Sequence, residues 1–431
     1  MPKSVITYRN IKGVAQTDFA KDIEKSVLSK QLLGSANKLV EQNNSTLSNI
    51  LNKHAPSKTR SISLRPSVPW IQENVFDAKR KRRRLERRWR TTKSLADRAA
   101  FVKQKRLVND MIIAEKSKYY LAQITECGKD QKALFRVIDA LLHRRSKPKL
   151  PEHQNIQDVL EMFSDFFISK IQKIRDTLDA QEDINPLSSV PETIVPENSI
   201  SVSLASFQSV TSEEVRKIVL GSPTKSCDLD PIPTWMIKTH LDMLLPAITD
   251  IINHSLASGV VPASMKHALV TPLLKKQSLD PNNAKNYRPV SNLSFLSKVL
   301  EKVVAGQLLE HMVTFDLHEP LQSAYRSGHS TETALVRVQN DLLRAVDKKQ
   351  GVILVLLDLS AAFDTIDHTI LLCRLKERLG VRGVALEWIK SYLSNRTQSV
   401  HVNGVSSKSG NLLYGVPQGS VLDPNFFCIY S

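Results

Sequence analysis

The amino-acid sequence predicts an α+β fold, and three patterns carry that prediction. Apolar residues recur with a helical period of about 3.6 residues in segments 294–312 and 331–349. The run HALVTPLLKK (267–276) is short and apolar and ends in lysines, which indicates a strand. The residues from Val352 to Leu357 are all apolar and do not alternate with polar ones, which is typical of a strand buried on both faces.

The first predicted segment, residues 1–70, is polar and mixed. Helical spacing is visible at Phe19, Ile23 and Val27, and again from Leu32 to Leu51. In the stretch HAPSKTRSISLRPSVPW (54–70), three prolines interrupt this spacing. We therefore expect an extended connector that ends on an exposed or half-docked Trp70.

The second segment, residues 71–174, is expected to be mostly helical and to bind nucleic acid. The chain has a net charge of +17, and between Lys79 and Lys149 the sequence holds 23 basic and 7 acidic residues. Helices that are basic on one side and apolar on the other suit a phosphate backbone. The residues predicted to make this contact lie in KRKRRRLERRWR (79–90) and are Arg82, Arg83, Arg84, Arg87 and Arg88.

Two other interpretations of the basic run stay open. A solvated charged helix has the same composition, and KRKRRR (79–84) also resembles a nuclear-localisation run. Downstream, residues 131–147 have the spacing of one amphipathic helix.

The third segment, residues 175–203, is rich in proline, serine and acidic residues and lacks periodicity, so it is predicted to be a linker. The more compact part of the chain is expected to span 204–431. Within it, Thr211 and Glu214 form a capping-box pattern that starts a helix. Another helix is predicted from Leu241 to Ala257.

Composition argues against several classes of protein. No apolar stretch reaches the length of about 18 residues that a membrane span needs, and the N-terminal residues lack the apolar core of a secretory signal. The four cysteines lie far apart without a CxxC pair. That spacing disfavours a disulfide framework or a zinc site and fits a reducing compartment.

Asp358 is the first candidate for chemistry, because it directly follows the apolar run. A carboxylate at the end of a buried strand is costly unless something pairs with it. A divalent cation such as Mg²⁺ suits this position, since it favours carboxylate oxygens together with substrate phosphates. A two-metal phosphoryl-transfer site needs at least one further carboxylate nearby. Alternatively, Asp358 is an ordinary helix N-cap.

Three further motifs are weaker when taken singly. In NYRPVSNL (286–293), Arg288 lies in a polar turn and suits bidentate phosphate contact, or is a plain surface arginine. SGHSTETAL (327–335) leads into a helix with Ser330 or Thr331 as its N-cap. In YGVPQGSVLDP (414–424), Gly415 and Gly419 let the backbone approach a ligand closely, although the same residues fit an ordinary turn.

The order of these motifs is more specific than any one of them. NYRPVSNL, QSAYRSGHSTETAL, LLDLSAAFDTIDH and YGVPQGSVLDP, in that order, resemble the reverse transcriptase domain of non-LTR (LINE-type) retrotransposons, above all the jockey- and CR1-like groups. The resemblance runs from about Lys225 to the last residue. The upstream 54–70 stretch and the ERRWR region resemble the segment between endonuclease and polymerase in such elements. The resemblance implies the fingers and a partial palm of a right-hand polymerase.

The resemblance also implies roles for individual residues. Asp358 would be the catalytic carboxylate that binds Mg²⁺, and Phe363 the aromatic residue that selects dNTP over NTP. Gln418 and Gly419 would contact the nucleotide and the template, and Arg288 the triphosphate, with Lys275 or Lys276 assisting. Asp364 and Asp367 are expected to be structural. The implied reaction is attack of a DNA primer 3′-hydroxyl on the α-phosphorus of a dNTP, templated by RNA.

Some features of the family pattern are missing. The aromatic-x-Asp-Asp motif and the thumb do not occur before Ser431, and Asp423 stands where the family usually has glycine, an expected source of backbone strain. We therefore expect the chain to be a fragment that is inactive alone, located in the nucleus, the cytoplasm or both. The alternative is a non-catalytic nucleic-acid-binding relic of a mobile element.

Overall fold

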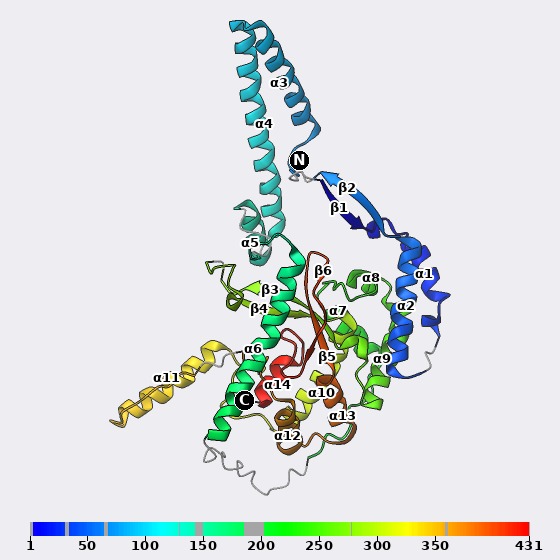
Figure 1. The fold of residues 1–431 in the computed structure, drawn as a ribbon, viewed down its shortest axis with the longest axis vertical. Coiled ribbons are helices and arrows are strands. Elements are labelled where there is room, and N and C mark those ends of the chain that lie inside the picture. The colour runs from blue at the N-terminus through cyan, green and yellow to red at the C-terminus, as the bar shows by residue number, and fades with distance from the viewer. Residues whose placement is uncertain are drawn as a thin grey trace. The chain divides into compact units, whose positions relative to one another are not determined.

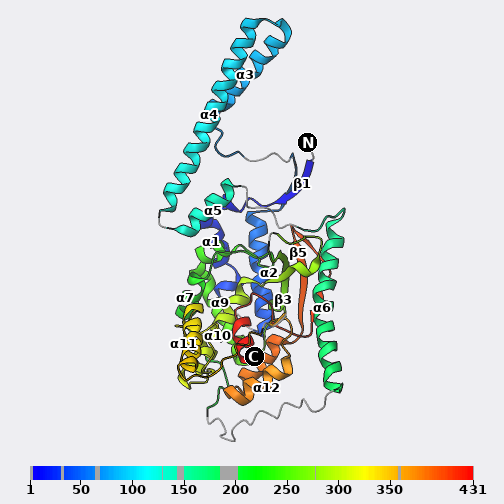
Figure 2. The same cartoon turned by 90° about the vertical axis from the view of Figure 1, so that its left-hand side faces the viewer.

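The computed structural model describes residues 3–30, 34–63, 68–128, 130–142, 150–184, 202–276, 278–357 and 361–430. The chain divides into two compact units (Figure 1, Figure 2). Unit 1 comprises Met1–Tyr8 and Lys58–Lys149, and unit 2 comprises Arg9–Ser57 and Leu150–Ser431. Asp358 lies outside the described residues. Within the described ranges, no helix is both long enough and apolar enough to cross a membrane.

Unit 1 is a strand pair followed by a helical hairpin. Strands β1 (Lys3–Tyr8) and β2 (Lys58–Ser63) pair antiparallel, so the predicted connector contains a strand. The helices are α3 (Glu73–Thr92), α4 (Leu95–Cys127) and α5 (Gln131–Leu141), which confirms the predicted helical region from Ile71. The turn between α3 and α4 is closed by Trp89 stacking on Phe101, with ring centroids 5.5 Å apart. Trp70 is half-buried against Tyr119 and Tyr120.

The sheet of unit 2 is mixed. Its strands are β3 (His267–Leu274), β4 (Tyr287–Asn292), β5 (Arg396–Val402), β6 (Val405–Ser406) and β7 (Gly410–Leu412). The predicted strand at 267–276 is thereby confirmed. β3 pairs antiparallel with β4 and parallel with β5, while β6 and β7 pair antiparallel with β5.

Helix α6 (Ile156–Ile184) runs alongside β5 (Figure 1). Phe163 and Phe167 on this helix are buried with Tyr287, Val270 and Val400 of the sheet. The Phe163 ring meets the Tyr287 ring edge-on at 4.8 Å, which is a favourable aromatic geometry. The apolar face of α6 therefore belongs to the sheet of unit 2.

Most of the remaining helices of unit 2 surround a second, larger core in which Trp388 and Phe426 are fully buried. The Trp388 indole N–H donates to Ser255 Oγ at 3.0 Å. The predicted capping box at Thr211 is confirmed, as are the helices predicted from Leu241 and over 294–312. The helices around this larger core are α1 (Gln16–Glu24), α2 (Ala36–His54), α7 (Ser212–Gly221), α8 (Thr234–Thr239), α9 (Leu241–Ser258), α10 (Phe295–Thr314), α12 (His368–Leu379), α13 (Gly383–Leu393) and α14 (Asp423–Tyr430).

The prediction of a buried strand from Val352 to Leu357 is wrong. These residues form no strand, and Leu356 and Leu357 are 84% and 87% exposed. A strand needs a hydrogen-bonded neighbour and an apolar surface to cover it, and this segment pairs with none of the described strands. Helix α11 (Thr331–Asp347) begins as predicted at a Ser330 N-cap, but its apolar face is also exposed.

The boundaries of the two units differ from the segment boundaries that the sequence predicts. α6 continues to Ile184, into the predicted linker 175–203, and packs on the sheet instead of joining the basic helices. α1 and α2, from the predicted segment 1–70, pack in the larger core of unit 2. In both cases the unit to which a helix belongs is decided by the surface that buries its apolar face. Composition alone does not show which surface that is. Residues 185–201 lie outside the described part of the chain.

Candidate active site

Two of the motifs singled out in the sequence are joined by backbone hydrogen bonds. The GVPQGS loop (Gly415–Ser420) lies against the segment 361–368, which contains the second half of LLDLSAAFDTIDH. Gly415 N donates to Ile366 O at 2.8 Å, and Val416 N donates to Phe363 O at 3.1 Å. The His368 ring nitrogen Nε2 donates to Gly415 O at 2.8 Å. The loop position is therefore set by segment 361–368.

Gly415 is the point of closest approach between these two segments. Its φ is +74°, and a Cβ placed there would lie 2.6–2.8 Å from the backbone O, C and Cα of Asp364. A side chain of any size therefore meets both a disfavoured backbone conformation and a steric clash. Glycine is required here by packing as well as by conformation.

The other side of the GVPQGS loop rests on buried polar groups. Ser291 N, on β4, donates to Gln418 O at 2.9 Å. Gly419 N donates to Asp423 Oδ2 at 3.2 Å, and Val421 N donates to Glu301 Oε2 at 2.6 Å. Both carboxyl groups are buried, which raises their pKa values, that of Asp423 to about 7.

Asp423 corrects an expectation from the sequence. Its backbone is not among those with positive φ, because it is the first residue of α14. The absence of glycine at this position therefore causes no backbone strain. Instead, the Asp423 carboxylate accepts a hydrogen bond from the GVPQGS loop.

A pocket opens where the GVPQGS loop, the sheet, segment 361–368 and α6 meet. The space inside it, together with the part open to solvent, is about 540 Å³. Burial raises the pKa of Asp364 to about 6, against an opposing effect of the Lys170 ammonium. Gln418 Oε1 is buried there without a hydrogen-bond partner within the described residues. The polar side chains that line the pocket are Lys170, Ser291, Asp364, Gln398, Gln418 and the two tyrosines Tyr287 and Tyr414.

α6 is fastened beside this pocket by one arginine. The Arg175 guanidinium forms an ion pair with Asp367 and lies 4.5 Å from the Tyr414 ring centroid, a cation–π distance. Asp367 also accepts from Thr369 N at 2.8 Å and Ile370 N at 3.1 Å as the N-cap of α12, which confirms its expected structural role. Neither Lys170 nor Arg175 was predicted, because nothing in the α6 sequence indicates which surface the helix covers.

Comparison with known proteins identifies the domain that contains this site. Residues 274–431 match the family described as reverse transcriptase (RNA-dependent DNA polymerase). The chain is 25% identical over 405 residues to a probable RNA-directed DNA polymerase from transposon X-element of Drosophila melanogaster, covering 89% of the chain and 42% of that protein. Residues 274–431 therefore form a reverse transcriptase domain.

Two jockey polymerases are also similar to part of this chain. The chain is 31% identical over 226 residues to the RNA-directed DNA polymerase from mobile element jockey of Drosophila melanogaster, and 33% identical over 225 residues to its Drosophila funebris counterpart. Each match covers 52% of the chain and 24% of the relative. The chain thus spans less than half the length of these curated relatives.

The structure brings some of the predicted residues of the reverse transcriptase domain together and separates others. Gln418 lies in the pocket, and Gly419 lies beside it at φ +104°. The Phe363 ring packs on Phe427 at 5.0 Å and does not line the pocket. Arg288 is exposed on β4 between two residues that do line it. Strand alternation therefore points its side chain to the opposite face.

The metal expected from the family is not matched by a complete ligand set here. Among the described residues, no group of three or more His, Cys, Asp or Glu side chains is close enough to hold a metal ion. Asp364 is the carboxylate on the pocket, since Asp367 pairs with Arg175 and Asp423 lies under the GVPQGS loop. This donor set does not hold Mg²⁺ without Asp358 or another ligand.

The arginines of α3 that are predicted to contact nucleic acid differ in whether they form ion pairs. Arg82, Arg83, Arg84 and Arg87 form no ion pair within the described residues, whereas Arg88 pairs with Asp97 at 3.0 Å. Their chemistry suits phosphate, and whether they bind it stays a prediction.

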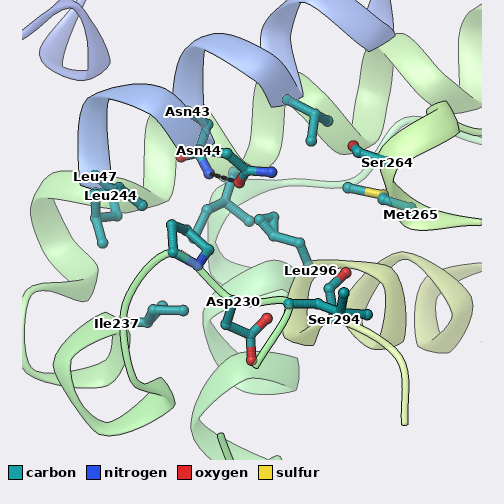
Figure 3. Close-up of a pocket in the computed structure, with 14 residues that line it drawn as sticks. Asn43, Asn44, Leu47, Asp230, Ile237, Leu244, Ser264, Met265, Ser294 and Leu296 are labelled. Carbon is teal, nitrogen blue, oxygen red and sulfur yellow. Dashed lines mark hydrogen bonds between the residues drawn. The ribbon is translucent and has the colours of Figure 1, made fainter. Parts of the chain in front are cut away.

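A second cavity of unit 2 lies between α2 and the loop around Asp230 (Figure 3) and has about 500 Å³ of space, its solvent-open part included. Asp230 accepts from Phe295 N at 2.7 Å and from Cys227 N at 3.0 Å, so both of its carboxylate oxygens are engaged. Asn43 donates to the side-chain oxygen of Asn44 at 3.2 Å. None of the residues predicted from the motifs lines this cavity.

Proposed function

We propose that this chain contributes the fingers and part of the palm of an RNA-directed DNA polymerase. Its reaction would be attack of a primer 3′-hydroxyl on the α-phosphorus of a dNTP over an RNA template. The observation that carries this proposal is the packing of the GVPQGS loop on segment 361–368. It creates one pocket that presents Gln418 and Asp364 inside a reverse transcriptase domain.

The residues of this pocket suit binding and orientation. Gln418 Oε1 is buried and unpaired, so a ligand donor that reaches it gains a hydrogen bond that replaces no other. The loop backbone is already fixed on both sides, so little ordering accompanies binding. Mg²⁺ would supply charge neutralisation for the phosphates. Asp358 is proposed as one of its ligands and Phe363 as the residue that selects deoxyribose.

We further propose that the isolated chain binds substrate without turning it over, because a single pocket carboxylate does not satisfy two divalent ions. The test uses the purified chain, a labelled RNA–DNA template–primer and Mg²⁺. We expect binding of the template–primer, weakened by Gln418→Ala, and no dNTP incorporation. Incorporation that Asp358→Ala abolishes would contradict the lack of turnover. Failure to bind the template–primer at all would contradict the proposed function.

A second candidate function rests on the unpaired arginines of α3. A nucleic-acid-binding protein without catalysis would use these arginines to neutralise phosphates. We propose that it would act in the nucleus, the cytoplasm or both. Replacing Arg82, Arg83, Arg84 and Arg87 by alanine should flatten the salt dependence of RNA affinity by up to about three units of log–log slope. Among the single substitutions, Arg88→Ala should change the slope least, since that guanidinium is already ion-paired. If all the substitutions left the slope unchanged, the electrostatic proposal would be wrong.

A further inference from the structure

The pocket beside the GVPQGS loop has a wall that the sequence motifs do not include. α6 precedes the matched reverse transcriptase residues 274–431, yet it contributes Phe166, Phe167, Lys170 and Ile171 to the pocket lining. The helix is a fixed wall. Phe163 and Phe167 are buried against the sheet, and Arg175 fastens the C-terminal half of the helix to Asp367 and Tyr414.

The approach of α6 to the sheet is close enough to be sterically specific. A Cβ placed on Gly410, in β7, would lie 2.4 Å from the Ile168 side chain. Ile168 lies two residues before Lys170 in the same helix. The position of the α6 backbone next to the pocket is therefore set by packing against the sheet.

Lys170 is the cation of this pocket. It is half-buried, forms no ion pair within the described residues, and its positive charge acts on the Asp364 carboxyl group. Arg288, which the motif resemblance placed on the triphosphate, points away from the pocket. An ammonium group that is partly shielded from water and unpaired is suited to a phosphate oxyanion.

We propose that Lys170 is a phosphate-binding residue of this pocket, and that Arg175 is a positioning residue that holds α6 in place for it. This inference rests on the proposed function of the pocket. Its ligand chemistry is a phosphate oxyanion next to a group that donates to Gln418. Two sources supply that chemistry, the triphosphate of a dNTP and the backbone of an RNA–DNA hybrid.

The experiment compares the full chain carrying Lys170→Gln, Lys170→Arg or Lys173→Gln. Lys173 is exposed on the same helix and does not line the pocket, so Lys173→Gln removes the same charge from the same element. Binding is measured for dATP with Mg²⁺, for deoxyadenosine, and for a short RNA–DNA hybrid. We expect Lys170→Gln to weaken dATP or the hybrid by about 10- to 100-fold, the range of a charge-assisted hydrogen bond. Lys170→Arg should restore most of the affinity, and Lys173→Gln should change it little.

The arms separate the possible results. Loss for dATP alone assigns the phosphate to the nucleotide, and loss for the hybrid alone assigns it to the template–primer backbone. Equal losses for deoxyadenosine and dATP would show a structural effect and overturn the inference. So would equal affinities of the Lys170→Gln and Lys173→Gln chains. A wild-type chain that binds neither dATP nor the hybrid would contradict the proposed function itself, which is a different failure.

Arg175→Gln tests the positioning role. It should weaken the same phosphate ligand less than Lys170→Gln does, and should add little in the double variant, because both act through one contact. Fully additive losses would show that Arg175 acts independently of Lys170.

Discussion

The Gly415→Ala substitution tests directly how the two motifs are held together. Gly415 has φ +74°, and its missing Cβ leaves room for the Asp364 backbone, three atoms of which lie 2.6–2.8 Å from the Cβ position. Alanine at positive φ costs about 1–2 kcal/mol. Forcing a methyl group into a packed contact costs about 1–3 kcal/mol more. We therefore expect Gly415→Ala to lower the free energy of unfolding of unit 2 by about 2–5 kcal/mol.

Gly404→Ala is the matched control. Gly404 has a similar φ of +82°, but nothing lies within 4 Å of its Cβ position. Its substitution should cost only the conformational term of about 1–2 kcal/mol. The difference between the two variants isolates the close approach of Gly415 to Asp364, and we expect it to be about 1–3 kcal/mol.

The measurement must report on unit 2 alone, since a chain of two units need not unfold in one step. Trp70 and Trp89 belong to unit 1, whereas Trp235 and Trp388 belong to unit 2. Urea unfolding is therefore followed by tryptophan fluorescence in a Trp70→Phe, Trp89→Phe background. If Gly415→Ala and Gly404→Ala cost the same within about 0.5 kcal/mol, the backbone contact does not hold the motifs together.

Two further predictions concern buried polar groups and helix ends. Asp423 has a folded-state pKa raised to about 7, so the folded chain keeps a proton that the unfolded chain has lost, and stability should fall as pH rises from about 4 to 7. Asp423→Asn, which stays neutral, should reduce that fall, measured as urea midpoints at pH 5 and pH 8, and an unchanged pH dependence would contradict the assignment. Thr211→Ala removes the capping box of α7 and should cost about 1 kcal/mol in the same unfolding assay. Thr211→Ser, which keeps the hydroxyl, should cost less, and equal losses would assign the effect to something other than the cap.

Local signals in the sequence predicted the elements that local physics controls. The capping residues Thr211 and Ser330 begin helices as predicted, and the apolar period located α9 and α10. The sequence holds one further local signal, between β5 and β6. Asn403 and Gly404 connect β5 to β6 with φ values of +54° and +82°. An Asn–Gly pair between apolar segments is a strong hairpin indicator, because both residues tolerate positive φ.

The predictions that did not hold, or were not made, depend on partners distant in the sequence. An apolar run such as Val352–Leu357 indicates a strand only if a neighbouring strand pairs with it, and the described structure provides none. Likewise, β3 and β5 pair in parallel although more than a hundred residues separate them. The period of α6 shows that it has an apolar face, but not that this face covers the sheet next to Gln418.

Two carboxyl groups are buried next to the GVPQGS loop, and the hydrogen bonds that they make explain why. Asp423 accepts from Gly419 N, Glu301 accepts from Val421 N, and Ser291 N donates to Gln418 O, so the loop backbone is satisfied from several sides. Burying two carboxyl groups is unfavourable by itself, and their raised pKa values show it. What this burial provides is a loop whose conformation is fixed before a ligand arrives. The Gln418 side-chain oxygen has no hydrogen-bond partner within the described residues, and Gln418 lines the same pocket as Lys170. A preorganised acceptor and an unpaired cation in one pocket favour a ligand that carries a hydrogen-bond donor and a phosphate together, which is the chemistry of a nucleotide.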